Sequence, residues 1–257
     1  MENIRALNTR QQAILEFINN NGNAVIKDLS LLHNVSEATV RRDLDELAAG
    51  GNIDRIRGGA TKSNSTTFER YHREKMKSML DEKRRIAAFA ASLVNNGDSI
   101  FLDSGTTTFF IARNLALRTD LTIITNNLDI AYSVQFNSTT SLIVTGGLRR
   151  DNYSVLIGSV AENTIKDVYV DITFMGCDAV NPVEGIFNSN FLEVGVKQLI
   201  SGCGKKTILV TDHSKFRHKA LARICGLDKI DMIITDNGID EKTLGMITKI
   251  VPNTVCV

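Results

Sequence analysis

From residue 97 onward, short apolar runs alternate with longer amphipathic stretches, and this alternation constrains the fold more than any other feature. The pattern predicts strands at 99–103, 122–126, 141–145, 172–176, 207–211, 232–235 and 254–257, and helices near 107–117, 128–136, 158–167, 193–203 and 240–249. Strands of nearly continuous Ile, Leu and Val with helices between them indicate a parallel sheet covered on both faces. With a leading helix at 81–96, capped by Asp81, residues 81–257 are predicted to form one mostly parallel, open α/β domain.

Residues 1–60 show a different pattern, with three helices followed by a short ribbon. Thr9, with Gln12 three residues later, matches a capping box for the first helix, and Ser36 is a favourable N-cap for the third. The second helix is expected at 26–33, and residues 53–57 alternate like a strand up to a Gly-Gly turn. The apolar positions predicted to be buried in the second and third helices are Leu29, Leu32, Val40, Leu44 and Leu47. This order of elements predicts a winged helix-turn-helix.

Between these two regions, residues 61–80 are polar and carry no sustained apolar period, so we expect a linker that ends in a short helix. The predicted domains are therefore 1–60, a linker at 61–80, and 81–257. No apolar run approaches the roughly 18–20 residues that span a bilayer, and the N-terminus does not resemble a signal peptide. The four cysteines form no C-x-x-C pair, which is typical of free thiols in a cytoplasmic protein without a metal site or cofactor.

The net charge of +1 does not by itself indicate nucleic-acid binding, because residues 1–62 hold eight Lys and Arg against eight Asp and Glu. The positions of the cations are more informative. Ser36, Thr39, Arg41 and Arg42 fall in the first turns of the third helix, where a recognition helix meets base edges. An arginine can bond both acceptors of guanine, which discriminates by about 1–3 kcal/mol.

The ribbon adds a second basic feature. Arg55 and Arg57 lie two residues apart on one strand, beside Gly58, and so form a basic wing suited to phosphates or the minor groove. The alternative is a plain helical domain in which Arg41 pairs with Asp45, or Arg42 with Glu46. Such pairs contribute only a few tenths of a kcal/mol.

A candidate anion site lies in the second domain, where a strand runs into Ser104, Gly105, Thr106, Thr107 and Thr108 and then into a helix. Free N–H groups and the helix dipole favour an anion there. The loop is not a nucleotide-binding motif, because the required glycine spacing and lysine are missing. The alternative to an anion site is an ordinary capped helix start. Polar residues and glycines at the strand ends meet at the same edge of such a sheet, namely Asp103, Asn126, Gly146, Gly147, Asp178 and Lys215, with Lys197 on a helix. The alternative is that Asn126 and the glycines only form turns and that Lys197 is a solvated charge.

The chain resembles the DeoR-type bacterial regulators. The resemblance is carried by V-S-x-x-T-V-R-R-D-L at Val35–Leu44, G-G-A at Gly58–Ala60, Arg73-Glu74, and Lys83–Ala87 in the first part of the chain. It continues with D-S-G-T-T at Asp103–Thr107, Thr125-Asn126, Gly146-Gly147 and D-x-S-K-F at Asp212–Phe216. Family members commonly carry Ser where His213 stands, which puts only a minor contact in doubt.

This resemblance implies a DNA-binding transcriptional repressor of a sugar-metabolism operon, working as a homodimer or homotetramer on double-stranded operator DNA. It also implies a sensor domain with the fold of ribose-5-phosphate isomerase and an effector that is a phosphorylated sugar or a derivative. The phosphate is expected on the 104–108 loop with Lys197 or Lys215 as counter-charge, and Asp103 and Asp178 are expected to bond hydroxyls.

Two alternatives come from other classes. A sugar-phosphate isomerase would need a carboxylate base, for which Glu193 or Asp178 could serve, with Lys197 as the cation. The attached DNA-binding module argues against this, and we assign no catalytic residue. A ligand-independent DNA-binding regulator is less compatible with the size of the second domain.

Overall fold

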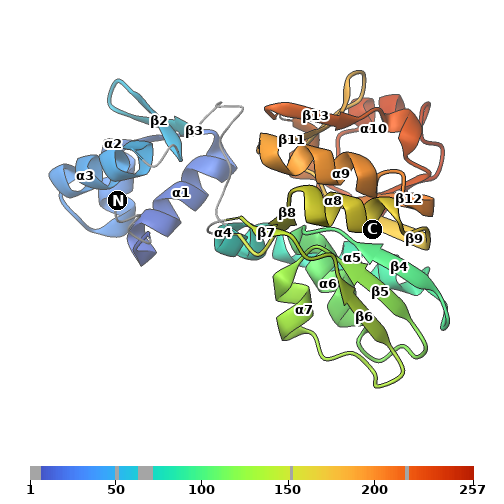
Figure 1. The fold of residues 1–257 in the computed structure, drawn as a ribbon. Coiled ribbons are helices and arrows are strands. Elements are labelled where there is room, and N and C mark those ends of the chain that lie inside the picture. The colour runs from blue at the N-terminus through green and yellow to red at the C-terminus, as the bar shows by residue number, and fades with distance from the viewer. Residues whose placement is uncertain (1–6, 50–51, 63–71, 151–152, 218–219) are drawn as a thin grey trace. The chain divides into compact units, whose positions relative to one another are not determined.

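In the computed structural model, residues 7–49, 52–62, 72–150, 153–217 and 220–257 are described (Figure 1). The chain divides into two compact units, residues 1–68 and residues 69–257, and each is described by itself. No helix among the described residues is long and apolar enough to cross a membrane.

The first unit has the element order of a winged helix-turn-helix, as predicted. It contains α1 (Thr9–Asn21), β1 (Asn23–Val25), α2 (Ile26–His33), α3 (Glu37–Ala49), β2 (Ile53–Ile56) and β3 (Gly59–Lys62). The strands form an antiparallel sheet in the order β1-β3-β2. The core of this unit is formed by Ile14, Leu15, Ile18, Ala24, Ile26, Leu29, Val40, Leu44, Leu47, Ile53 and Ala60.

The prediction that Leu32 is buried in the core of this unit is wrong. Leu32 is 59% exposed, whereas Ile26 and Leu29 are buried. Successive helix residues turn by about 100°, so Leu32 is rotated by about 120° from Ile26 around the axis of α2. Only part of the apolar residues of this short helix therefore face the core, whereas Leu31 and Leu32 are exposed.

The helix caps differ from expectation at two positions. Asn8, and not Thr9, caps α1: its Oδ1 accepts from the Gln11 N–H at 2.9 Å, and the Gln11 side chain accepts from the Asn8 N–H at 3.1 Å. The capping box is therefore present one residue earlier than predicted. Asp81 does not cap its helix, because α5 (Leu80–Ser92) follows Met79 without a side-chain cap. Ser36 does accept from the Thr39 N–H, at 3.2 Å.

The second unit is built on a seven-stranded sheet, and every pair of neighbouring strands is parallel, as predicted. The strand order is β15-β14-β12-β9-β4-β5-β6. The strands are β4 (Ser99–Leu102), β5 (Thr122–Thr125), β6 (Ser141–Val144), β9 (Val170–Met175), β12 (Gly204–Val210), β14 (Met232–Thr235) and β15 (Thr254–Cys256).

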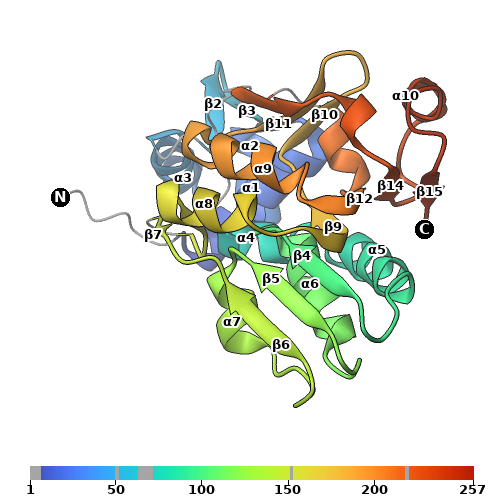
Figure 2. The ribbon, with the colours of Figure 1, turned by 45° about the vertical axis from the view of Figure 1, so that its right-hand side comes forward.

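Helices cover both faces of this sheet (Figure 2). Side chains alternate along each strand, so Ile100 and Leu102 pack toward α5, α6 (Thr106–Leu115) and α7 (Leu128–Ser133). Phe101 faces the other layer, formed by α8 (Ser159–Lys166), α9 (Val194–Ile200) and α10 (Glu241–Ile247). This explains why the strands are apolar throughout.

Short strands and one short helix complete the unit, and most of them were not predicted. β10 (Ala179–Asn181), β11 (Gly185–Asn188) and β13 (Ala222–Cys225) form a small antiparallel sheet after the carboxyl end of β9. β7 (Leu148–Arg149) and β8 (Leu156–Ile157) form a two-stranded ribbon after β6. The short helix expected at the end of the linker is α4 (His72–Lys77), while residues 63–71 lie outside the described residues.

Candidate functional site

The exposed face of α3 carries Arg41 and Arg42, because Val40, Asp43 and Leu44 face the core. The buried Asp43 pairs with Arg10 at 2.6 Å, which ties α1 to α3. Arg41 pairs with Glu37 at 2.7 Å on the helix surface. Within the described residues Arg42 forms no ion pair, so its guanidinium is available to a partner.

The ion pairs considered as an alternative for α3 do not form. Instead of pairing with Arg41, Asp45 lies 3.0 Å from Nε of Arg55 on β2. Glu46 accepts from the Gln11 side chain at 2.6 Å rather than pairing with Arg42. Asp43, Asp45 and Glu46 of α3 therefore hold α1 and the ribbon in place.

The two arginines of the ribbon differ in their surroundings. Arg55 also donates to the Gly59 carbonyl at 3.0 Å, whereas Arg57 is exposed in the turn and bonds none of the described residues. Gly58 has a φ of +80°, and at Gly59 a Cβ would lie 2.1 Å from the Ala24 carbonyl oxygen. Glycines here allow the turn and the close approach of β1 to β3.

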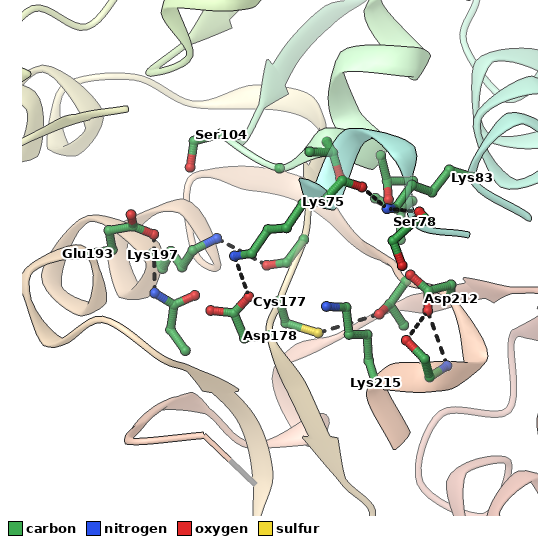
Figure 3. Close-up of a pocket in the computed structure, with 18 of the residues that line it drawn as sticks. Lys75, Ser78, Lys83, Ser104, Cys177, Asp178, Glu193, Lys197, Asp212 and Lys215 are labelled. Carbon is green, nitrogen blue, oxygen red and sulfur yellow. Dashed lines mark hydrogen bonds and ion pairs between the residues drawn. The ribbon is translucent and has the colours of Figure 1, made fainter. Parts of the chain in front are cut away.

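A polar cavity opens in the second unit beyond the carboxyl ends of β4, β9 and β12 (Figure 3). The structure brings seven of the twelve predicted effector residues to its wall: Ser104, Gly105, Thr106, Thr107, Asp178, Lys197 and Lys215. Its other lining residues are Lys75, Ser78, Lys83, Tyr153, Val155, Gly176, Cys177, Asn188, Glu193, Val210, Thr211, Asp212 and Ser214.

The remaining five predicted residues do not line this pocket. Asp103 is fully buried behind Lys197, and the Thr108 hydroxyl turns inward to the carbonyls of Asp103 and Gly105. Asn126 donates to the Leu156 carbonyl at 3.3 Å and so supports β8. Gly146 and Gly147 have φ of +69° and +117° in the segment that leads into β7.

The start of α6 forms one end of the pocket. Gly105 is the N-cap of α6 and no side chain caps this helix. Within the described residues, the N–H groups of Thr106 and Thr107 find no acceptor. Such free donors, with the positive end of the helix dipole, suit an anion.

A buried ion pair lies beside this loop. Nζ of Lys197 lies 2.5 Å from Oδ2 of Asp103, and it also donates to the Gly176 carbonyl at 3.1 Å. Burial alone would lower the pKa of Lys197, but the carboxylates of Asp103 and Glu193 outweigh it and raise that pKa. Lys197 is therefore charged but largely neutralised by Asp103.

A second pair joins α4 to the segment after β9. Nζ of Lys75 lies 2.8 Å from Oδ1 of Asp178, whose Oδ2 accepts from the Ser189 N–H at 2.9 Å. Burial pushes the pKa of Asp178 up, but Lys75 and Lys215 overcome this and hold it below 3.8. Asp178 is therefore a carboxylate at neutral pH.

Lys215 differs from the other lysines of the pocket, because its ammonium makes no hydrogen bond or ion pair within the described residues (Figure 3). Its neighbour Asp212 is held by the N–H and hydroxyl of Ser214. Burial raises the pKa of Asp212, and Lys215 and Lys83 more than offset this, so that the pKa is lowered. Among the described lysines that line the pocket, Lys215 is therefore the one whose ammonium has no such partner.

The β7–β8 ribbon closes another side of the pocket. Arg150 pairs with Glu193, whose other oxygen accepts from Asn188 at 3.1 Å. The same guanidinium lies 3.8 Å from the centre of the Tyr153 ring. Glu193 is thus fixed by two partners, which is a poor arrangement for a general base. Burial raises the pKa of the Cys177 thiol to about 12, so this residue is a poor nucleophile.

Comparison with known proteins identifies the family. Residues 10–66 match the DeoR-like helix-turn-helix domain, and residues 78–237 match the DeoR C terminal sensor domain. A putative aga operon transcriptional repressor of Escherichia coli is 35% identical over 91% of this chain and 88% of its own length. This chain belongs to the DeoR family of transcriptional regulators.

A second curated relative agrees with the assignment to the DeoR family, whereas the similarity to solved structures is weaker. The glycerol-3-phosphate regulon repressor of Escherichia coli is 30% identical over 88% of this chain and 90% of its own length. Among solved structures, ribose 5-phosphate isomerase A of Methanocaldococcus jannaschii is similar over 54% of this chain and 55% of its own, with 20% identity and a TM-score of 0.38. This last similarity is too low to bear on activity.

Several pocket residues of this DeoR-family chain were missed by the sequence analysis. Lys75 lies in the polar segment that was assigned to the linker, and Lys83 was noted only as part of a motif. Tyr153, which lines the pocket, and its neighbour Arg150, which does not, lie between β7 and β8, two strands that were not predicted. Lys75 and Arg150 have acidic partners that are 103 and 43 residues away along the chain, for which the sequence holds no periodic signal. Within the described residues, His, Cys, Asp and Glu form no cluster that could hold a metal ion.

Proposed function

We propose that this protein is a transcriptional repressor of a sugar-metabolism operon, controlled by a phosphorylated sugar or sugar derivative that binds in the pocket. The observation that carries the proposal is the combination, in one pocket, of the uncapped start of α6 with the unpaired ammonium of Lys215. A phosphate supplies the negative charge and the acceptor oxygens that both groups lack.

The rest of the pocket suits the sugar part of such a ligand. Asp178 and Asp212 are carboxylates that can accept hydrogen bonds from hydroxyl groups, and Asn188 and Ser214 add neutral polar groups. The printed names of two relatives refer to the aga operon and to the glycerol-3-phosphate regulon, which supports a ligand from carbohydrate metabolism.

On the DNA side, we propose that α3 enters the major groove with Ser36, Thr39, Arg41 and Arg42, while the ribbon with Arg57 contacts the adjacent backbone. Arg55 and Gly58 shape that ribbon. In the cytoplasm, a homodimer or homotetramer would present two such units to the two half-sites of an operator. Ligand binding would control DNA binding through different affinities for two arrangements of the chain.

The experiment that tests the pocket is a thermal-shift screen of the full-length protein against phosphorylated sugars and the same sugars without phosphate. We expect only phosphorylated compounds to raise the melting temperature. Lys215→Met should weaken binding of the best compound about tenfold or more, since one charge-assisted bond is lost. Lys205→Met, at an exposed position on β12, is the matched control and should bind like the wild type.

Three results would contradict the proposal. If the unphosphorylated sugars raise the melting temperature as much as the phosphorylated ones, the phosphate is not recognised. Unchanged binding by Lys215→Met would remove the assigned counter-charge. Turnover of the sugar phosphate would favour the isomerase-type alternative instead.

A further inference from the structure

Helix α4 lies at a special place in the chain. It is the first described element after residues 63–71, which lead from the helix-turn-helix unit, and it belongs to the second unit. Lys75 on α4 and Ser78 directly after it line the ligand pocket (Figure 3). A short segment of the interdomain connection is therefore also a wall of the pocket.

Two lysines hold α4 in this position. Lys75 reaches across to Asp178, and the two side chains are only 20% and 11% exposed. Lys83, on the next helix, is buried and donates to the carbonyls of Lys75 and Ser78, both at 2.5 Å. It thereby binds one carbonyl group in the last turn of α4 and one directly after the helix. Both ammonium groups belong to pocket residues.

The joint between α4 and α5 is strained. Met79 has φ 51° and ψ 44°, the left-handed region that a residue with a Cβ rarely adopts. Such a conformation persists only where surrounding contacts impose it. The direction in which α4 leaves the sensor domain therefore depends on the contacts of Lys75 and Lys83.

We propose that α4 reports the occupancy of the pocket to the connection with the helix-turn-helix unit: an anionic ligand gives Lys75 a further acceptor besides Asp178 and so holds α4 against the sensor domain. This inference rests on the proposed function of the pocket. Because ligand binding and α4 docking are coupled, the docked helix in turn increases ligand affinity. The ligand would thus reduce the conformational freedom of α4.

Hydrogen exchange on the full-length protein tests this proposal, with inorganic phosphate as the probe and sodium chloride at equal ionic strength as the reference. In the wild type, phosphate should slow exchange about threefold or more in residues 104–108 and also in residues 72–79. In Lys75→Met, residues 72–79 should exchange faster than in the wild type, and phosphate should slow only the loop. Lys77→Met, on the exposed side of the same helix, should behave like the wild type.

The outcomes separate the two proposals. If phosphate slows exchange in the 104–108 loop but not in residues 72–79, the pocket stands and the role of α4 is overturned. If phosphate slows neither segment, the phosphate site fails and the role of α4 falls with it. Equal behaviour of Lys75→Met and Lys77→Met would also overturn the assignment of Lys75.

Discussion

The side chains of Lys197 and Asp103 form an ion pair with an N–O distance of 2.5 Å, and they are only 5% and 0% exposed. The pair joins α9 to the carboxyl end of β4, and the Gly176 N–H adds a further bond to Asp103. Truncating one partner would leave a buried charge without compensation.

We therefore expect Lys197→Met to lower the free energy of unfolding by about 3–5 kcal/mol, measured by urea denaturation. Lys205→Met, an exposed lysine on β12, is the control and should change stability by less than about 0.5 kcal/mol. The folded-state pKa of Lys197 is raised, so the contribution of its ammonium is complete at neutral pH and is lost as the pH rises above 10.5. A loss no larger than that of the control would contradict the structural role of the pair.

The pair of Lys75 and Asp178 should show the opposite dependence on pH. The folded-state pKa of Asp178 lies below 3.8, its ordinary value, so its contribution is present above 3.8 and is lost as the pH falls below it. Asp178→Asn should therefore be less stable than the wild type at neutral pH, and the difference should narrow in acid. Urea denaturation across this pH range measures it, and a difference that stays constant would rule out the ionic contribution.

For the nucleic-acid interface, Arg42→Ala is the most direct test, because this arginine has no ion pair among the described residues. We expect specific operator binding to weaken at least about tenfold, since an arginine–guanine contact contributes about 1–3 kcal/mol. The operator can be selected from random duplex DNA, and affinity measured by fluorescence anisotropy. Arg84→Ala, an exposed arginine of the sensor domain, is the matched control. A variant that binds like this control would disprove the assignment of α3.

The ribbon should contribute to DNA affinity independently of the base sequence. Arg57→Ala should weaken binding to all duplexes alike and reduce the slope of log K against log salt concentration by about 1. The melting temperature should not change, because Arg57 bonds none of the described residues. An unchanged salt slope would show that Arg57 does not contact the DNA backbone.

The sequence analysis correctly predicted features that depend on local periodicity. The seven parallel strands follow from their apolar composition, and the bounds of α2 and β14 agree with the structure. Ser36 was correctly identified as the residue that caps α3. The error at Thr9 is one of a single position, because the neighbouring Asn8 satisfies the same capping pattern. The error at Leu32 arose because the buried stripe of α2 includes only Ile26 and Leu29.

The pocket was only partly predictable, because its charge pattern depends on pairs that are distant in sequence. Lys75 and Asp178 are 103 residues apart, and Lys197 and Asp103 are 94 apart. A sequence shows that lysines are present, but not which of them are neutralised. For this reason Lys197 and Lys215 were equivalent candidates for the counter-charge, and the structure distinguishes them.

The bond between Arg55 and Asp45 has a consequence for how the protein can choose among operators. It joins the ribbon to α3, and Arg10 joins α3 to α1 through Asp43. These elements therefore form one rigid unit, which fixes the distance between the contacts of α3 and those of the ribbon within a half-site. In the proposed homodimer or homotetramer, any tolerance toward operators with different spacing between half-sites must then come from outside this unit.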